Sequence, residues 1–262
     1  MTADETTEFW MEFPVHDLAA RCAILHSQRR EMQGQHAVIE IEAVRRTLSS
    51  VWIKGSGIEV GAGSRPFFLP AGATCYYGDI RDKAALDHYF NGLDVAVNGY
   101  IDAQTMAGIK DASLDFVISA HVIEHLFNPV GSIKNAIRVL RKSGIFLLVV
   151  PEKSKTWDRD RPVTTIQHMI ADAADGGATT KLQAYLEHVE YVHPVMTGQH
   201  IPTAEVQEAA RRIMDAQMDI HVHSWTHREF RQLLDYCAEK FRFRVVHSQA
   251  VQNENIFVLQ RY

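Results

Sequence analysis

The fold of this chain is decided by the stretch Gly57-Ile58-Glu59-Val60-Gly61-Ala62-Gly63-Ser64-Arg65, followed by Asp79 at the end of a second apolar run. This order predicts a strand, a tight glycine turn and, about twenty positions on, an acidic residue, as in doubly wound α/β domains that bind a nucleoside. Glycines permit positive φ and let backbone N–H groups approach a ligand that a Cβ would block. The carboxylate of Asp79 can then accept two hydrogen bonds from a ribose diol.

Short apolar runs alternate with helical stretches after this turn, an order typical of a parallel sheet with right-handed crossovers. An amphipathic helix, Val130 to Arg141, precedes the last of these runs. A closing helix, Thr226–Lys240, starts with a capping box from Thr226 to Glu229, and two strands joined by a hairpin turn follow it. We therefore predict an α/β fold with a doubly wound, mostly parallel seven-stranded sheet whose last two strands are antiparallel. The predicted strands are Gly57–Val60, Thr74–Tyr77, Val95–Asn98, Leu114–Ser119, Ile145–Val150, Phe243–Gln249 and Asn255–Gln260.

Four parts are expected along the chain. Residues 1–50 form an N-terminal helical segment, with two helices over residues 14–50 that break near Gly34. Residues 51–151 form the nucleoside-binding core, and residues 225–262 complete it. Residues 152–224 are rich in histidine and turn formers and are expected to form a helical cap on the substrate side. Its expected helices are Val163–Ala174, Lys181–Val189 and Thr203–Asp219.

Composition narrows the class of partner. The chain has 262 residues, of which 46% are apolar and 23% charged, and its net charge is −5. Such a balance argues against nucleic acid, because phosphate binding needs a basic face. Three separated cysteines, a polar start and a longest apolar run of only Ile145–Val150 predict a cytoplasmic protein that does not enter a membrane. The oligomeric state is left open, a homo-oligomer included.

The residues around the glycine turn indicate which nucleoside is bound. A dinucleotide fingerprint requires glycine or alanine at position 66, and Pro66 stands there instead. Glu59, at the end of the strand, can orient the turn or meet a cationic ligand directly or through water. S-adenosylmethionine carries an ammonium and a sulfonium but no phosphate, so it suits a turn that lacks a pyrophosphate site.

At this point the chain resembles class I S-adenosylmethionine-dependent methyltransferases of the small-molecule, methyltransferase-11-like type. Two departures stand out: Arg65 replaces a frequent third glycine, and Lys142-Ser143-Gly144 replaces Pro-Gly-Gly. The resemblance spans about residues 55–150 and implies a Rossmann-like methyltransferase fold. Four segments in the family's order and spacing carry it: Glu59–Gly63, Gly78-Asp79, Leu114–Leu126 (LDFVISAHVIEHL) and Arg138–Gly144 (RVLRKSG).

The resemblance also implies positions for the cofactor. The glycine turn would pass under its methionine part, Asp79 would hold the ribose, Asp102 with Ala103 would lie at the adenine edge, and Ala120 with His121 would line the methionine tail. Each has an ordinary alternative: a structural turn for the glycines, a helix N-cap for Asp79 and a loop acid for Asp102. The predicted cofactor-binding set is Glu59, Gly61, Ala62, Gly63, Asp79, Ile80, Asp102, Ala103, Ala120 and His121.

Methyl transfer is an in-line displacement in which the protein mainly aligns the reactants and removes water. A hydroxyl acceptor benefits from a general base, and histidine is the usual choice near neutral pH. His121 and His125 follow the fourth predicted strand, at the sheet edge where ligands bind, and His223 lies on the expected cap. These three are the catalytic candidates, with a hydrogen-bonded structural histidine as the alternative for each.

The cap offers candidates for binding the acceptor. Arg159 and Arg161 could clamp an anionic group, although a salt-bridge network within the cap is an equal alternative. Trp225 could face a sugar and His221 could contact it, although burial of the tryptophan is the default. His221 and His223, with His227, also invite a metal site, but no second cluster with ligand spacing is visible and none is predicted. With Asp158–Thr165 (DRDRPVTT) and His221-x-His223-x-Trp225-Thr226, this region resembles a bacterial subgroup often associated with surface-polysaccharide genes, which points to a glycan or other small polar acceptor.

Three functions follow in order of preference. The first is a methyltransferase that uses S-adenosylmethionine to methylate oxygen, or less readily nitrogen, of a small polar acceptor such as a sugar or glycan. The second is a module of the same fold that binds the nucleoside without catalysis. The third is an NAD-dependent oxidoreductase, which Pro66 and the absence of a Tyr-x-x-x-Lys pair disfavour.

Overall fold

The computed structural model of the protein describes residues 15–262, so the polar start of the chain lies outside the described residues. The described part of the chain divides into two compact units, with the boundary between Ala43 and Val44. One helix, α2 (Val15–Trp52), replaces the two that the sequence predicted. Gly34 lies inside this helix, so the prediction of a break there was wrong. A single glycine costs a helix only about 1 kcal/mol, and the flanking Glu31, Met32 and Gln33 favour helix.

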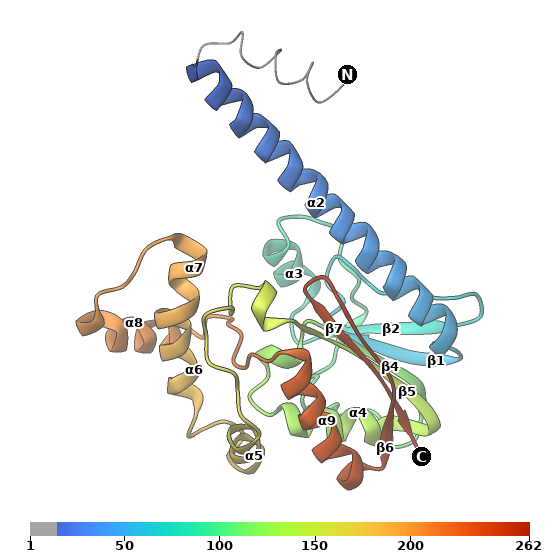
Figure 1. Ribbon diagram of the computed structural model, residues 1–262. Helices are drawn as coiled ribbons and strands as arrows, with labels where there is room; N and C mark the ends of the chain where they lie inside the picture. Colours follow the sequence, from blue (N-terminus) through green and yellow to red (C-terminus); the bar gives the residue numbers. More distant parts are fainter. Residues whose placement is uncertain (1–14) are drawn as a thin grey trace, which may run out of the picture. The chain divides into compact units, whose positions relative to one another are not determined.

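In the described part of the chain, seven strands form one sheet in the order β3-β2-β1-β4-β5-β7-β6 (Figure 1). The first five strands are parallel, and β7 runs antiparallel to both β5 and β6. The predicted fold class is thereby confirmed. The strand order reverses between β1 and β4, which is where ligands bind in doubly wound sheets. The strands are β1 (Ser56–Val60), β2 (Thr74–Asp79), β3 (Gly99–Tyr100), β4 (Leu114–Ala120), β5 (Leu140–Pro151), β6 (Phe243–Val251) and β7 (Glu254–Arg261).

Two predicted boundaries near the sheet were wrong. Residues 95–98 are not a strand, because Ala96 N–H bonds the Gly63 carbonyl while Asn98 N–H bonds that of Tyr77, which breaks the regular ladder. Strand β3 follows them and is only two residues long. The predicted helix Val130–Arg141 ends earlier, at Val139, because Leu140 already pairs with Leu114 as the first residue of β5.

Two helices lie side by side and pack against the sheet: α4 (Pro129–Val139) and α9 (His227–Phe241) (Figure 1). The α4 helix begins with Pro129 at its first turn and with the Asn128 side chain accepting a hydrogen bond from Gly131 N–H. Thr226 is the N-cap of α9, but its hydroxyl bonds the Glu229 carboxylate instead of a backbone N–H. A shorter helix, α3 (Lys83–Tyr89), follows β2. The central apolar core forms between the sheet and α4 and α9.

Residues 152–224 form helical elements with a small apolar core of their own, centred on Tyr185, Val189 and Ile220. The return of this segment to the sheet is fixed, because the backbone N–H groups of Val222 and His223 donate to the Glu124 carbonyl at 2.7 and 3.1 Å. No helix of the described chain is long and apolar enough to cross a membrane. The elements are η2 (Lys153–Lys155), α5 (Ile166–Asp175), α6 (Lys181–Glu187), the π-helical turn η3 (His188–Val192), α7 (His193–Thr197) and α8 (Thr203–Asp215).

Candidate functional site

The glycine turn lies at the carboxyl end of β1. Gly61 and Gly63 have φ values of +66° and +54°, which L side chains rarely adopt. A Cβ on Gly61 would overlap the Val122 side chain, and one on Gly63 would overlap the Phe90 ring. Gly61 N–H also bonds the Gly78 carbonyl of β2 at 2.9 Å. Both positions therefore require glycine, and the turn is held against the neighbouring strand.

Glu59 holds the far end of the same loop. Its carboxylate is 1% exposed and accepts hydrogen bonds from Phe67 N–H at 3.0 and 3.2 Å. Burial raises the pKa of Glu59 to about 7, against the opposing effects of the Phe67 hydrogen bond and the Arg45 charge. Of the two roles predicted for this carboxylate, the geometry matches the one in which it orients the turn.

Asp79 ends β2 beside the glycine turn, since Gly78 pairs with Val60 of β1. Its Oδ1 atom accepts a hydrogen bond from Arg81 N–H at 2.8 Å. It is not a helix cap: Asp82 caps α3 by accepting from Ala85 N–H at 2.8 Å. The adjacent Ile80 side chain is 58% exposed, an apolar surface at the edge where the nucleoside was expected.

Asp102 and Ala103 follow β3 at the same edge of the sheet. The two oxygens of Asp102 accept hydrogen bonds from Gln104 N–H at 2.8 Å and from the Thr105 hydroxyl at 2.9 Å. Ala103 is buried, with its carbonyl bonded to the Ser132 hydroxyl. The Asp102 carboxylate thus shapes its own loop, which matches the alternative given for it.

Ala120 and His121 lie where β4 ends. His121 has a φ of +54°, and its Nε2 atom lies 2.9 Å from Glu254, which pairs with the buried guanidinium of Arg45 at 2.5 Å. Burial alone would lower the pKa of His121, but the neighbouring carboxylates of Glu124 and Glu254 raise it to about 9. His121 is thus anchored by a chain of buried charges that begins in α2.

A cavity of about 520 Å³ lies beside the carboxyl ends of β4 and β5. Lys155 and Arg159 are the lining residues with fixed charge, and both are basic. The Trp157 side chain is 53% exposed. The cavity is lined by His121, Pro151, Ser154, Lys155, Thr156, Trp157, Arg159, His221 and Asn253.

The predicted acceptor-binding residues divide into two groups. Arg159 and His221 line the cavity, whereas Arg161 and Trp225 are only 2% and 1% exposed. Arg161 donates to the carbonyls of His221 and Val222, both at 2.6 Å. It therefore holds in place residues 221–223, the segment that returns from the cap to the sheet. Trp225 packs with its ring centroid 5.3 Å from that of His223. Arg161 thus fits the alternative of a salt-bridge network within the cap, and Trp225 fits the alternative of a buried ring.

The catalytic candidates also lie in different surroundings. His121 lines the cavity. His125 lies next in the chain to the buried Glu124, with its Nδ1 atom 2.8 Å from Asp219. His223 is fully buried, 3.4 Å from Asp172, and burial lowers its pKa to about 3, with a further contribution from His168. His121 is therefore the catalytic candidate that reaches the cavity.

Sequence reasoning missed several residues of this site. Glu124 stood in the motif that carried the family resemblance but received no role of its own. Asn253 lies in the hairpin turn between β6 and β7, Glu254 is the first residue of β7, and Arg45 belongs to α2. Their roles depend on tertiary contacts, because nothing in the spacing of the hairpin indicates that Glu254 contacts His121, 133 residues away.

Part of the chain matches a known protein family. Residues 58–148 match the family model described as a methyltransferase domain. No curated protein sequence matches the chain. The family match covers the glycine turn, Asp79, the run from Leu114 to Leu126 and most of β5, and it confirms the predicted resemblance.

Several solved structures show a distant likeness to the chain. One is the crystal structure of a candidate Zn-dependent alcohol dehydrogenase of Rhodobacter sphaeroides, with 14% identity, a TM-score of 0.46, and 82% of this chain and 87% of that one covered. A SAM-dependent methyltransferase of Aquifex aeolicus has 12% identity and a TM-score of 0.43, with 82% of this chain and 86% of that one covered. A candidate S-adenosylmethionine-dependent methyltransferase of Listeria monocytogenes has 11% identity and a TM-score of 0.49, with 87% of this chain and 99% of that one covered. Likenesses at this level do not discriminate between activities. The family match is more informative: residues 58–148 carry a methyltransferase domain, which supports S-adenosylmethionine-dependent methyl transfer of the class I type.

Proposed function

We propose that the chain methylates an oxygen atom of a small polar acceptor, with an acidic sugar or glycan end as the class that the cavity fits best. The observation that carries this proposal is the cavity beside β4 and β5. Its volume of about 520 Å³ lies within the usual range for small-molecule sites. Lys155 and Arg159 suit an anionic group, and the exposed ring of Trp157 suits the face of a sugar.

The carboxyl ends of β1, β2 and β4 support the cofactor assignment. S-adenosylmethionine supplies a methyl group already activated on a sulfonium. In the proposal, Gly61, Ala62 and Gly63 present backbone to its methionine part, and the Asp79 carboxylate accepts from the ribose hydroxyls. Ile80 and Ala103 contact the adenine, while Ala120 and His121 border the reacting end. Glu59 keeps the turn in shape, and Asp102 acts through its own loop.

The residues at the reacting end would mainly align the acceptor and exclude water. A bond forms between the acceptor oxygen and the methyl carbon while the carbon–sulfur bond breaks, and its electron pair stays on sulfur. A hydroxyl acceptor must also lose a proton. His121, the imidazole at the end of β4 that lines the cavity, can take this proton only in its neutral form, which its pKa of about 9 places above neutral pH. Segments 154–159 and 221 supply much of the cavity wall, which supports residues 152–224 as the acceptor-side cap.

Replacing Asp79 by alanine should weaken the binding of S-adenosylhomocysteine about 5- to 30-fold, because a charge-assisted hydrogen bond contributes about 1–2 kcal/mol. Titration calorimetry measures this directly. Asp82→Asn is the matched control: it removes a charge three residues away but keeps a good helix cap, so its Kd should stay at the wild-type value. Equal affinities for wild type and Asp79→Ala would remove the ribose assignment.

Arg159→Gln should raise the KM for an acidic sugar about 10-fold, because it removes one charge-assisted contact. The KM for the matching neutral sugar and the affinity for S-adenosylhomocysteine should not change. The control is Lys142→Gln, an exposed lysine near the opposite end of β5. Formation of S-adenosylhomocysteine with a panel of acidic sugars, neutral sugars and amines tests the function itself. Turnover with amines alone would contradict the proposal.

A further inference from the structure

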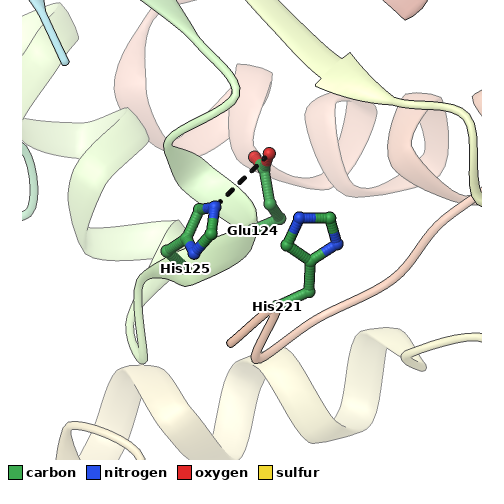
Figure 2. A group of neighbouring side chains, drawn as sticks. All are labelled: Glu124, His125 and His221. Carbon is green, nitrogen blue, oxygen red and sulfur yellow. Dashed lines mark ion pairs between the residues drawn. The ribbon is translucent and has the colours of Figure 1, made fainter. Parts of the chain in front are cut away.

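Three side chains from distant parts of the sequence converge at the end of β4. Glu124 and His125 belong to the turn η1 (Ile123–His125), and His221 belongs to the segment that returns from the cap (Figure 2). The backbone bonds from Val222 and His223 to the Glu124 carbonyl bring the two segments together. One potential ligand atom from each of the three side chains lies within 4.8 Å of the other two.

Glu124 is a buried carboxylate without an adequate partner. It is 0% exposed, and neither oxygen has a hydrogen-bond partner among the described residues. The imidazole nitrogens of His121 and His125 lie 3.7 and 3.9 Å from it, too far for hydrogen bonds. A buried carboxylate left in this state is costly, and it is normally paired or bound to a metal.

The two imidazoles are held as metal-binding histidines usually are. Asp219 lies 2.8 Å from Nδ1 of His125, and Asp158 lies 2.5 Å from Nδ1 of His221. A carboxylate at Nδ1 fixes the proton there and leaves the Nε2 lone pair available for a metal. Figure 2 shows that the Nε2 side of each ring faces Glu124. Each of the two imidazoles therefore has a carboxylate at its Nδ1 atom and a free lone pair on Nε2 that is directed toward Glu124.

The surrounding charges leave room for a cation at the centre. Asp219 has an arginine of its own, Arg81 at 2.8 Å, and Asp158 has Arg161 at 3.6 Å. In the described part of the chain, Glu124 has no lysine or arginine within ion-pair distance, only the two histidines. Neither imidazole reaches hydrogen-bonding distance, so a cation beside Glu124 would supply the direct contact that its carboxylate lacks.

We propose that Glu124, His125 and His221 bind one divalent transition-metal ion of the Zn²⁺ class. Two imidazole nitrogens and one carboxylate oxygen suit Zn²⁺, whereas Mg²⁺ and Ca²⁺ prefer oxygen ligands throughout. Metal–ligand bonds of about 2.0–2.2 Å place tetrahedral ligands about 3.4 Å apart. The Glu124–His125 separation of 3.9 Å needs to close only slightly to reach this geometry.

The position of the ion connects it with the cavity, because His221 is both a ligand and a lining residue. A three-ligand zinc site keeps a fourth position for water or substrate. An acceptor hydroxyl or carboxylate at the cavity wall could occupy it. This last connection rests on the proposed function, whereas the binding of the metal does not.

A second cluster, His168, Asp172 and His223, has a similar composition but lacks the same preparation. Both histidines approach Asp172 directly, at 3.2 and 3.4 Å, and the Thr180 hydroxyl bonds the same carboxylate. No carboxylate on the far side of either ring, comparable to Asp158 or Asp219, is found among the described residues. This cluster serves as the internal control.

The test is a Zn²⁺ titration of the full chain after treatment with a chelator, without cofactor or acceptor. Wild type should bind one ion per chain, and its thermal unfolding midpoint should rise with Zn²⁺. Glu124→Gln and His221→Ala should each weaken binding about 100-fold or more, because each removes a ligand. His168→Ala should bind within about 3-fold of wild type, because its ring belongs to the second cluster.

Several results would overturn the proposal. These are no stoichiometric binding by wild type, unchanged affinity in both ligand variants, or loss of binding in His168→Ala. Circular dichroism checks that each variant is folded. If Glu124→Gln does not fold, His221→Ala decides, because that side chain is 27% exposed at the cavity edge. Failure to methylate a sugar would leave the metal result unaffected, so the two proposals fail separately.

Discussion

Glu254→Gln should lower the free energy of unfolding by about 3–5 kcal/mol, the usual cost of breaking a buried ion pair from one side. Arg45 and Glu254 have side chains only 8% and 4% exposed, and Glu254 accepts from both the Nε and the terminal nitrogen of the guanidinium. The variant leaves the arginine charge buried without a carboxylate. Urea denaturation, with unchanged m-value, measures the loss.

Asp87→Asn provides the matched control for this pair. Asp87 pairs with Lys83 at 2.7 Å, but the two side chains are 43% and 55% exposed. Exposed pairs of this kind contribute less than about 1 kcal/mol. The double variant Arg45→Met with Glu254→Met should recover much of the lost stability, since an apolar pair avoids the uncompensated charge. A loss of under 1 kcal/mol in Glu254→Gln would show that the pair is not buried as described.

The pH dependence of the free energy of unfolding should show the effect of the raised pKa of Glu59. Burial raises the pKa of this carboxyl from 4.5 to about 7 in the folded state, so the folded chain holds a proton that the unfolded chain has released. Stability is therefore lost as pH rises from about 4.5 to about 7. Glu59→Gln cannot ionise. Relative to wild type, it should gain about 2–3 kcal/mol between pH 5 and pH 8, given 1.36 kcal/mol for each pKa unit.

Chemical denaturation of both proteins at pH 5 and pH 8 measures this change. Glu152→Gln is the control, because the Asn255 and Ser154 hydrogen bonds outweigh burial and lower the pKa of Glu152. That carboxyl is ionised in both states throughout the range, so the difference between Glu152→Gln and wild type should stay nearly constant. A constant difference for Glu59→Gln as well would contradict the raised pKa.

The glycine turn and the order of the strands could be predicted from sequence because their signals are local. Gly61 and Gly63 indicate a backbone conformation that depends only on the local turn. The hydrophobic run of β5 indicates a strand that is buried on both faces. The order of such segments then sets the sheet. The same reasoning failed at Gly34, where helix-favouring neighbours outweighed one glycine, and at residues 95–98, where bonds to a neighbouring loop replaced a ladder.

The cavity and the histidine cluster could not be predicted in the same way, because they depend on separations of about a hundred residues. His221 gains its surroundings from Asp158 and Glu124, which lie on different segments. A spacing analysis examines near neighbours in the chain, so it paired His221 with His223 and His227. The structure places His221 with Glu124 and His223 with Asp172.

The anchoring of the return segment on the Glu124 carbonyl has a consequence for how such enzymes can diverge. The cavity wall comes from His121, from six residues between 151 and 159, and from His221 and Asn253, whereas helices α5 to α8 contribute no lining residue. Insertions or exchanges among those helices can accumulate while the two anchored ends keep their positions. Acceptor choice can thereby be inherited unchanged through extensive remodelling of the outer helices, and a chimaera that swaps residues 166–215 should retain it.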